Sequence, residues 1–315
     1  MGMTVSWMLV AAAVVGFCVS AASGFFLIPA LHRLHFGQTI REDGPTWHNK
    51  KQGTPTMGGF CFILGVLVAA GLVYAGLLRL APELVLPQQV QAGLLVLFLA
   101  FGSGFIGFLD DFIKVVRHRN LGLLAWQKLI LQFLVTGCFM AGLHSLGLMT
   151  RTIMLPGLGA VDLGLAYYPI AFFGIIFLVN AVNLTDGLDG LCSSVTFVSM
   201  LGYLLAASML GFYHVAVLST AMAAACAGFL VWNFYPAKVF MGDTGSMFLG
   251  GIVTALAFVL CRPELVLFFG IVYIWDAMTV VIQRVYFKLT HGRRIFRMTP
   301  IHHAFEMRGW REVKI

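Results

Sequence analysis

Long uncharged runs of apolar residues constrain this chain more than any other feature. Nine apolar stretches follow one another along it, with only short polar segments between them. A helix needs roughly 20 apolar residues to cross a bilayer, and it satisfies its backbone hydrogen bonds internally, as the bilayer core requires. The sequence therefore predicts an all-α polytopic integral membrane protein, with 1–315 as one transmembrane domain. The predicted spans lie at about 5–31, 57–80, 89–109, 123–148, 166–182, 190–210, 214–235, 246–262 and 265–287.

The composition excludes a soluble protein. Hydrophobic residues make up 60% of the chain and charged residues 10%, whereas soluble domains contain about 45–50% apolar and about 25% charged residues. All six cysteines lie in apolar stretches without C-x-x-C spacing. Neither a disulfide framework nor a zinc site is therefore indicated.

Positive charge is concentrated on one side of the predicted membrane. If the N-terminus is outside, every Lys and Arg faces inward except Arg79, Arg151 and Arg262. This bias fixes the orientation by the positive-inside rule, and it accounts for the net charge of +7 without a nucleic-acid partner. The connector 149–165, on the outside, is expected to form a small hairpin. The inward segments are predicted at about 32–56, 110–122, 183–189, 236–245 and 288–315.

Two adjacent carboxylates, Asp110 and Asp111, end an apolar run that carries no charge from Gln91 onward. If the helix continues, Lys114 lies on their face, because residues three and four apart are neighbours on a helix. An acid at the bilayer centre costs roughly 2.5–3.5 kcal/mol. The pair is therefore expected at the membrane edge, facing a divalent cation or a cationic partner. A solvated helix end is the alternative.

Two further acidic segments follow inward-facing span ends. Asn183, Asp186 and Asp189 lie within seven positions and have the capacity to bind a metal or sugar hydroxyls. Asp243 lies between glycines at a helix start, where backbone N–H groups favour anions and the carboxylate favours a hard cation. Ordinary helix capping is the alternative for both segments. The neighbouring Phe240 would either stack on a nucleobase or lie in the membrane interface.

Other inward residues have more open interpretations. Lys51 and Thr56 gain a role if their loop folds back over a phosphate; the alternative is an ordinary positive-inside loop. His302 and His303, with nearby Arg and Trp, suit anion and sugar contacts, but a basic segment of this kind also suits anionic lipid. Asp276, in the middle of the last predicted span, either serves a functional site or pairs with a neighbouring helix.

The predicted topology puts the three acidic segments on one membrane face. Carboxylate oxygens without cysteine or an H-E-x-x-H motif suggest Mg²⁺ rather than zinc. Lysines such as Lys51, Lys114 and Lys128 would neutralise charge that develops in phosphoryl transfer. The residues therefore predict a Mg²⁺-dependent phosphoryl-group transferase at the cytosolic membrane face, acting on one soluble phosphorylated molecule and one lipid.

The inward motifs resemble those of the polyprenyl-phosphate N-acetylhexosamine-1-phosphate transferases. GFLDDFIK at 107–114, NLTDGLDGL at 183–191 and MGDTGS at 241–246 carry this resemblance. IREDGP at 40–45, GTPTMGG at 53–59 and TPIHHAFE at 299–306 are similar to those of one branch, the bacterial phospho-N-acetylmuramoyl-pentapeptide transferases. The resemblance covers nearly the whole length.

The resemblance implies transfer of phospho-N-acetylmuramoyl-pentapeptide from its UDP carrier to undecaprenyl phosphate, giving lipid I and UMP. This is the first membrane step of peptidoglycan synthesis, placed at the cytoplasmic face of the bacterial inner membrane. It also implies Mg²⁺ and a homodimer. Carried over by position, Asp110, Asp111 and Asp243 are the catalytic and metal-linked carboxylates. The implied substrate-binding residues are Lys51, Thr56, Lys114, Lys128, Asn183, Asp186, Gly187, Leu188, Asp189, Asn233, Phe240, His302 and His303.

The chain departs from the family pattern at two places. Ala304 stands where the family often has a third consecutive histidine, so a contact from that histidine is not essential here. The family also implies a tenth span after Trp310, whereas this sequence ends at Ile315.

Two other functions compete with this interpretation. One is a transferase that acts on UDP-N-acetylglucosamine. The other is a cation-coupled transporter, but transporters place substrate-binding acids near the bilayer midplane. Here only Asp276 has such a position, and the other acids of the motifs lie at the inner edge.

Overall fold

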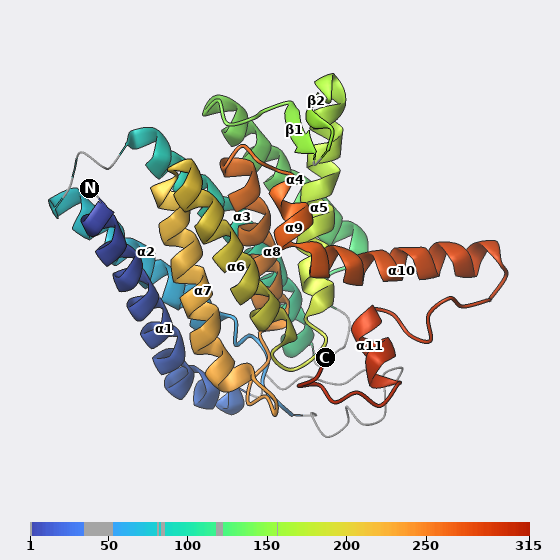
Figure 1. Cartoon of the computed structure of the whole chain (residues 1–315). Coiled ribbons are helices and arrows are strands. Elements are labelled where there is room, and N and C mark those ends of the chain that lie inside the picture. Colours follow the sequence, from blue (N-terminus) through green and yellow to red (C-terminus); the bar gives the residue numbers. More distant parts are fainter. Residues whose placement is uncertain (1, 35–52, 81, 83–85, 118–121, 156) are drawn as a thin grey trace.

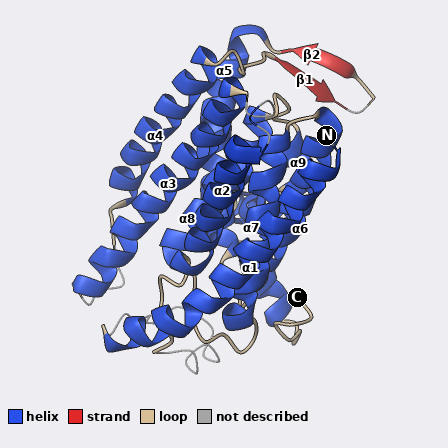
Figure 2. Cartoon of the chain, turned by 90° about the vertical axis from the view of Figure 1, so that its left-hand side faces the viewer, coloured by secondary structure: helices blue, strands red, loops and turns tan. Residues whose placement is uncertain are grey.

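The structure is a computed structural model that describes residues 2–34, 53–80, 82, 86–117, 122–155 and 157–315. Within these residues, eight helices are long and apolar enough to cross a membrane. They run along a common direction in one bundle (Figure 1, Figure 2). The all-α polytopic prediction is therefore confirmed. The helices are α1 (Gly2–Arg33), α2 (Phe60–Leu80), α3 (Pro87–Val116), α4 (Ala125–Ser145), α5 (Tyr167–Thr185), α6 (Leu191–Leu210), α7 (Tyr213–Asn233) and α8 (Gly242–Val259).

The ninth predicted span, 265–287, is wrong as a single crossing. It is divided at Gly270 into α9 (Leu265–Phe269) and α10 (Ile271–Leu289). Helix α10 turns sideways and projects out of the bundle (Figure 1). Asp276 and two basic residues near its end make α10 less apolar, and it is not among the eight spanning helices. Apolar length alone did not reveal this change of direction.

Small elements mark the two ends of the bundle. Strands β1 (Thr152–Leu155) and β2 (Gly159–Asp162) form an antiparallel hairpin, which confirms the predicted hairpin in this connector. A single 3₁₀ turn, η3 (Gly164–Ala166), leads from it into α5. The short helix α11 (Ile301–Glu306) lies at the opposite end, below α10 (Figure 1).

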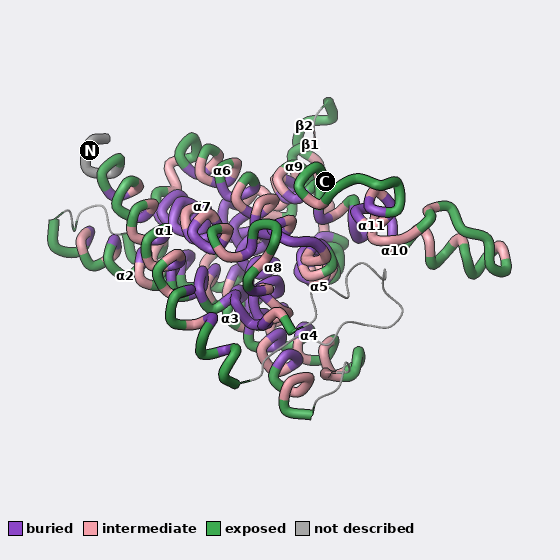
Figure 3. The backbone as a smooth tube through the Cα atoms, turned by 90° about the horizontal axis from the view of Figure 1, so that it is seen from below, coloured by how far each residue is buried: buried purple, intermediate pink, exposed green. Residues whose placement is uncertain are grey.

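Helix α8 forms the centre of the bundle. Every residue from Thr244 to Val259 is buried, and Figure 3 shows the buried parts of the chain gathered in the middle of the bundle, around α8. Helix α3 crosses α8 closely because glycines face the contact. A Cβ at Gly107 would overlap the main-chain carbonyl of Asp243, and one at Gly251 would lie 2.6 Å from the Cα of Ala100. Small residues let membrane helices approach in this way, and the crossing brings the end of α3 to the start of α8.

We expect Gly107→Ala to destabilise the protein strongly. The added methyl group meets backbone, which cannot move aside as a flexible side chain can, and overpacking costs about 1–3 kcal/mol or more. Thermal unfolding in detergent measures the effect. Gly137→Ala on α4 is the matched control, because nothing lies within 4 Å of its added Cβ. Equal stability of the two variants would contradict the close crossing.

Candidate active site

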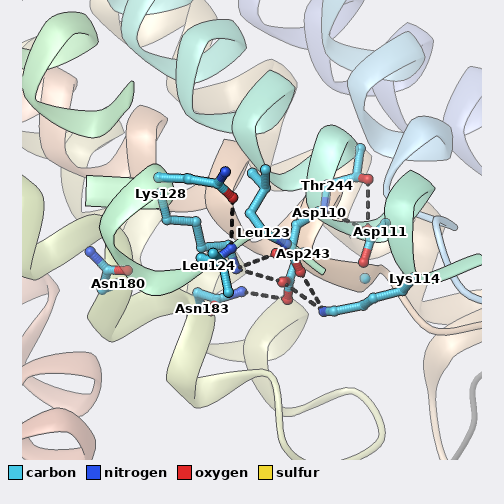
Figure 4. A network of polar contacts seen from close by, with 12 residues as sticks. Asp110, Asp111, Lys114, Leu123, Leu124, Lys128, Asn180, Asn183, Asp243 and Thr244 are labelled. Carbon is cyan, nitrogen blue, oxygen red and sulfur yellow. Dashed lines mark hydrogen bonds and ion pairs between the residues drawn. The ribbon is translucent and has the colours of Figure 1, made fainter. Parts of the chain in front are cut away.

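Three carboxylates converge where α3 ends and α8 begins. Asp110 and Asp111 belong to the last turns of α3, and Asp243 belongs to the first turn of α8. One oxygen from each lies within 4.8 Å of the others. Asp110 and Asp111 are 2% and 3% exposed, so their charges need partners inside the protein. Figure 4 shows the three side chains directed toward one another.

Two lysines supply the neutralising charge. The Nζ atom of Lys114 lies 2.6 Å from Asp110 Oδ2 and 3.0 Å from Asp243 Oδ2. The Nζ atom of Lys128, on α4, lies 2.9 Å from Asp243 Oδ2 and 3.3 Å from Asp110 Oδ1. Lys114, which was predicted to lie on the carboxylate face of α3, therefore contacts a carboxylate of that face. Lys128, on a second helix, contributes the other ammonium group. Each lysine bridges the same two carboxylates.

Neutral donors also hold Asp110 and Asp111. Thr244 donates to Asp111 Oδ2 from its backbone N–H, at 2.8 Å, and from its hydroxyl, at 2.7 Å. The backbone N–H of Leu123 donates to Asp110 Oδ1 at 2.8 Å. Neither donor was predicted from the sequence. Thr244 stands inside the MGDTGS motif and was identifiable there, whereas a backbone N–H such as that of Leu123 leaves no sequence signal.

Asn183 connects α5 to the cluster. Its Nδ2 donates to Asp243 Oδ1 at 3.0 Å and to Ser246 Oγ at 2.8 Å. Ser246, also in the motif but not predicted, donates its own hydroxyl to the Gly242 carbonyl at 3.0 Å. Asp243 is thus held by one amide and two ammonium groups, which orient both of its oxygens.

A backbone ladder places the segment that contains Thr56 against the start of α8. Phe240 N–H donates to Pro55 O at 2.9 Å, and Gly58 N–H donates to Phe240 O at 2.8 Å. Thr56 is buried, and a Cβ at Gly242 would lie 2.7 Å from its Oγ1 and 2.6 Å from Asp111 Oδ2. Thr56 therefore lies beside the carboxylate cluster. The other predicted residue of this loop, Lys51, lies outside the described residues.

The turn 186–190 between α5 and α6 lies beside the cluster and is held by its own contacts. Asp189 Oδ2 accepts a hydrogen bond from Ala237 N–H at 2.9 Å. Asn233 Oδ1 accepts from Gly190 N–H at 3.2 Å, and Asn233 Nδ2 donates to Val239 O at 2.9 Å. The amide of Asn233 is therefore used inside the protein, where it joins this turn to the start of the 239–243 segment.

Helix capping, the alternative for these acids, is wrong in the described structure. Helix α6 has Gly190 at its N-cap and α8 has Met241, and neither helix has a side-chain cap hydrogen bond. Asp243 instead serves the carboxylate cluster. Burial, together with the charges of Asp243, Asp111 and Asp189, raises the pKa of the Asp186 carboxyl well above its usual range.

The two predicted histidines lie on α11 and are each paired with a carboxylate. His302 Nδ1 lies 2.7 Å from Asp276 Oδ2, and His303 Nδ1 lies 2.6 Å from Glu306 Oε2. A Cβ at Gly187 would overlap the ring of His302. The structure therefore brings His302 to the 186–190 turn. Asp276 pairs with a neighbouring helix, which is one of the two roles expected for it from the sequence.

The carboxylate cluster has the donor set of a hard divalent cation. Asp110, Asp111 and Asp243 offer only oxygen atoms, and their spacing allows one ion to be shared. Both lysines contact Asp243 Oδ2, which shows that this point attracts positive charge. The cluster could therefore hold a metal ion, with lysines next to it that suit phosphate oxygens.

Comparisons with known proteins agree with this chemistry. Residues 93–261, which run from α3 to the end of α8 and contain all three carboxylates, match the family Glycosyl transferase family 4. The chain is 43% identical to the phospho-N-acetylmuramoyl-pentapeptide-transferase of Bacillus subtilis over 301 residues, 95% of this chain and 90% of the relative. It is 41% identical to that of Clostridium kluyveri over 308 residues, 98% of this chain and 93% of the relative.

We expect a divalent cation to stabilise the folded protein against heat. A ligand that binds only the folded state adds about 2.7 kcal/mol at 100 times its Kd. Thermal unfolding with added Mn²⁺, together with the EPR signal of free Mn²⁺, measures binding. Asp243→Asn should remove both effects, whereas Asp162→Asn, in β2 at the opposite end, should keep them. A full response in Asp243→Asn would place the cation elsewhere.

We expect Asp186→Asn to change how stability depends on pH in the metal-free protein. Because the pKa of Asp186 is raised, the folded state keeps this proton to a higher pH than the unfolded chain. Stability therefore falls as pH rises from about 4 through the raised pKa. Asp186→Asn should flatten this fall and raise the unfolding temperature at the alkaline end. A pH dependence identical to that of the wild type would contradict the raised pKa.

Proposed function

Because this chain belongs to Glycosyl transferase family 4 and, within it, to the phospho-N-acetylmuramoyl-pentapeptide transferases, we infer that the carboxylate cluster is its active site. The chain is a membrane phosphotransferase that transfers phospho-N-acetylmuramoyl-pentapeptide to a polyprenyl phosphate. We propose UDP-N-acetylmuramoyl-pentapeptide as the donor and undecaprenyl phosphate as the acceptor. An oxygen of the acceptor phosphate attacks the sugar-linked β-phosphorus. The bond between this phosphorus and the oxygen that bridges it to the α-phosphorus breaks, and that oxygen leaves as part of UMP. The products are lipid I and UMP.

The observation that carries the proposal is the bridging of two carboxylates by two lysines. A diphosphate brings several negative charges to the site, and Lys114 and Lys128 can turn from carboxylate to phosphate oxygens over a short distance. Mg²⁺ held by Asp110, Asp111 and Asp243 would supply the charge that neutralises the diphosphate. Asn183 and Thr244 keep the carboxylates oriented while the lysines move.

The neighbouring turn supplies the proposed donor side of the site. This turn contains Asp186, Gly187, Leu188 and Asp189. Asp186 is close enough to Asp243 and Asp111 for their charges to act on it, and Gly187 meets His302 on α11. The carboxylates of the turn would accept hydrogen bonds from hydroxyl and amide groups of a sugar-nucleotide. Phe240 is half-buried and held by its backbone next to Thr56. We propose that its ring stacks on uracil. Lys51 and His303 remain predicted substrate contacts.

The charge distribution supports a cytoplasmic site in the bacterial inner membrane. The three basic residues assigned to the outside lie at the ends of helices or strands, away from the carboxylate cluster: Arg79 in the last turn of α2, Arg151 next to β1, and Arg262 after the end of α8. Of the described inward residues, Lys114, Lys128 and Lys238 lie at the site end, as expected of the inward side. A homodimer is proposed from the family resemblance alone.

The family assignment separates the rival functions. The relatives that match at 41–43% identity are named for the muramoyl-pentapeptide reaction, so the N-acetylglucosamine transferase is less supported. A transporter does not account for three carboxylates clustered at one end of the bundle rather than at its middle.

We expect purified protein to release UMP from UDP-N-acetylmuramoyl-pentapeptide when undecaprenyl phosphate and Mg²⁺ are present. EDTA should abolish release, and Asp243→Ala should lower the rate by about 10³-fold or more, since it removes a metal-linked carboxylate held by three partners. Chromatography of UMP and of the lipid product measures both.

UDP-N-acetylglucosamine offered with the same lipid serves as the substrate control. Turnover of this smaller donor alone would support the rival transferase, and release that survives EDTA would remove the metal from the mechanism. Asp162→Asn, at the far end of the bundle, should leave the rate unchanged.

A further inference from the structure

Asp276 is a buried acid on a helix that is otherwise largely exposed. Helix α10 projects from the bundle, with α11 below it (Figure 1), and the side chain of Asp276 is 4% exposed. An isolated carboxylate in such surroundings is costly. Its Oδ2 atom pairs with His302 Nδ1 at 2.7 Å, and the side chain of His302 is also 4% exposed. The pair is therefore enclosed, and each side chain depends on the other.

This contact decides which nitrogen of His302 is available. When Nδ1 donates to a carboxylate, Nε2 becomes the free nitrogen of the neutral ring. Around the pair lies an apolar pocket lined by residues such as Ile271, Val272 and Trp275, which offer few other hydrogen-bond partners for the ring of His302. Asp276 therefore fixes both the tautomer and the orientation of the His302 ring.

The ring of His302 lies against the turn that follows α5. A side chain at Gly187 would overlap Nε2 of His302, so the absence of a Cβ there lets ring and turn meet directly. The same turn is supported from the C-terminal segment a second time, because Asp189 N–H donates to Glu312 Oε2 at 3.1 Å. The position of the turn thus depends on segments that α10 and α11 hold in place.

We propose that Asp276 is a positioning residue for sugar-nucleotide binding. It holds His302 in the Nδ1–H tautomer, and through that ring it sets the position of the turn 186–189. Asp276 itself touches no substrate. The inference rests on the proposed function, in which this turn binds the donor and the lipid acceptor binds elsewhere.

A role limited to fastening α11 to α10 predicts a different pattern. Loss of a contact that only holds α11 against α10 lowers stability and changes KM for both substrates alike. Loss of a positioning residue acts on the donor side and depends on the presence of His302. The two substrates and a double variant therefore distinguish these roles.

The kinetic test replaces Asp276 with leucine, which suits the apolar surroundings, and with asparagine, whose carbonyl still accepts from Nδ1–H. KM for UDP-N-acetylmuramoyl-pentapeptide should rise by about tenfold or more in Asp276→Leu and by less in Asp276→Asn. KM for undecaprenyl phosphate should stay within about twofold. Met278→Leu, on the same helix and 36% exposed, is the matched control and should resemble the wild type.

The double variant tests whether Asp276 acts through His302. Asp276→Leu combined with His302→Gln should be no worse than His302→Gln alone, because coupled residues are not additive. Additive losses would overturn the proposal. Equal increases in both KM values, accompanied by a lower unfolding temperature, would also overturn it.

An NMR measurement separates this inference from the proposed function. In protein labelled with ¹⁵N in the histidine rings, the resonances lost in His302→Gln identify His302. These resonances should show the Nδ1–H tautomer of His302 in the wild type, and the ring should no longer favour this tautomer in Asp276→Leu. An unchanged tautomer would overturn the inference whatever the activity. If the wild type failed to turn over the donor, the proposed function would fail, while the tautomer would still decide whether Asp276 controls His302.

Discussion

The structure depends on keeping three carboxylates together where α3 ends and α8 begins. Their mutual repulsion is offset by two lysines that each bridge Asp110 and Asp243. Four helices take part in this balance: α3 and α8 carry the acids, α4 brings Lys128, and α5 brings Asn183. The close crossing of α3 and α8 is what makes the arrangement possible, because a bulkier residue at the crossing would separate the acids. The site is thus a consequence of how the bundle is packed.

Much of this could be predicted from the sequence, for identifiable physical reasons. Apolar length indicated the spanning helices, and the alternation of inward and outward segments put the acidic motifs at one end. The contact between Lys114 and Asp110 followed from helical spacing. The approach of Lys128 to Asp243 was not predictable by spacing, because it joins residues 115 positions apart through tertiary packing. The backbone N–H of Leu123 was equally invisible, since every residue but proline carries one.

The last part of the chain was the least predictable. The stretch 265–287 is apolar enough to suggest a span, yet Gly270 divides it and α10 leaves the bundle. Hydrophobicity reports how much apolar surface a helix has, and it contains no information about the direction in which the helix runs. For the same reason the partner of Asp276 stayed open, because His302 becomes its neighbour only when α11 folds back beneath α10.

The burial of α8 has a consequence for how the bilayer acts on the site. A membrane whose thickness does not match the protein is accommodated by tilting the helices that touch lipid. Helix α8, covered by protein from Thr244 to Val259, has little lipid contact through which to respond, whereas α4 exposes much of its surface. We therefore expect hydrophobic mismatch to displace Lys128, on α4, more than Asp243, on α8. Bilayer thickness would then act on this enzyme through the distance between a lysine and a carboxylate.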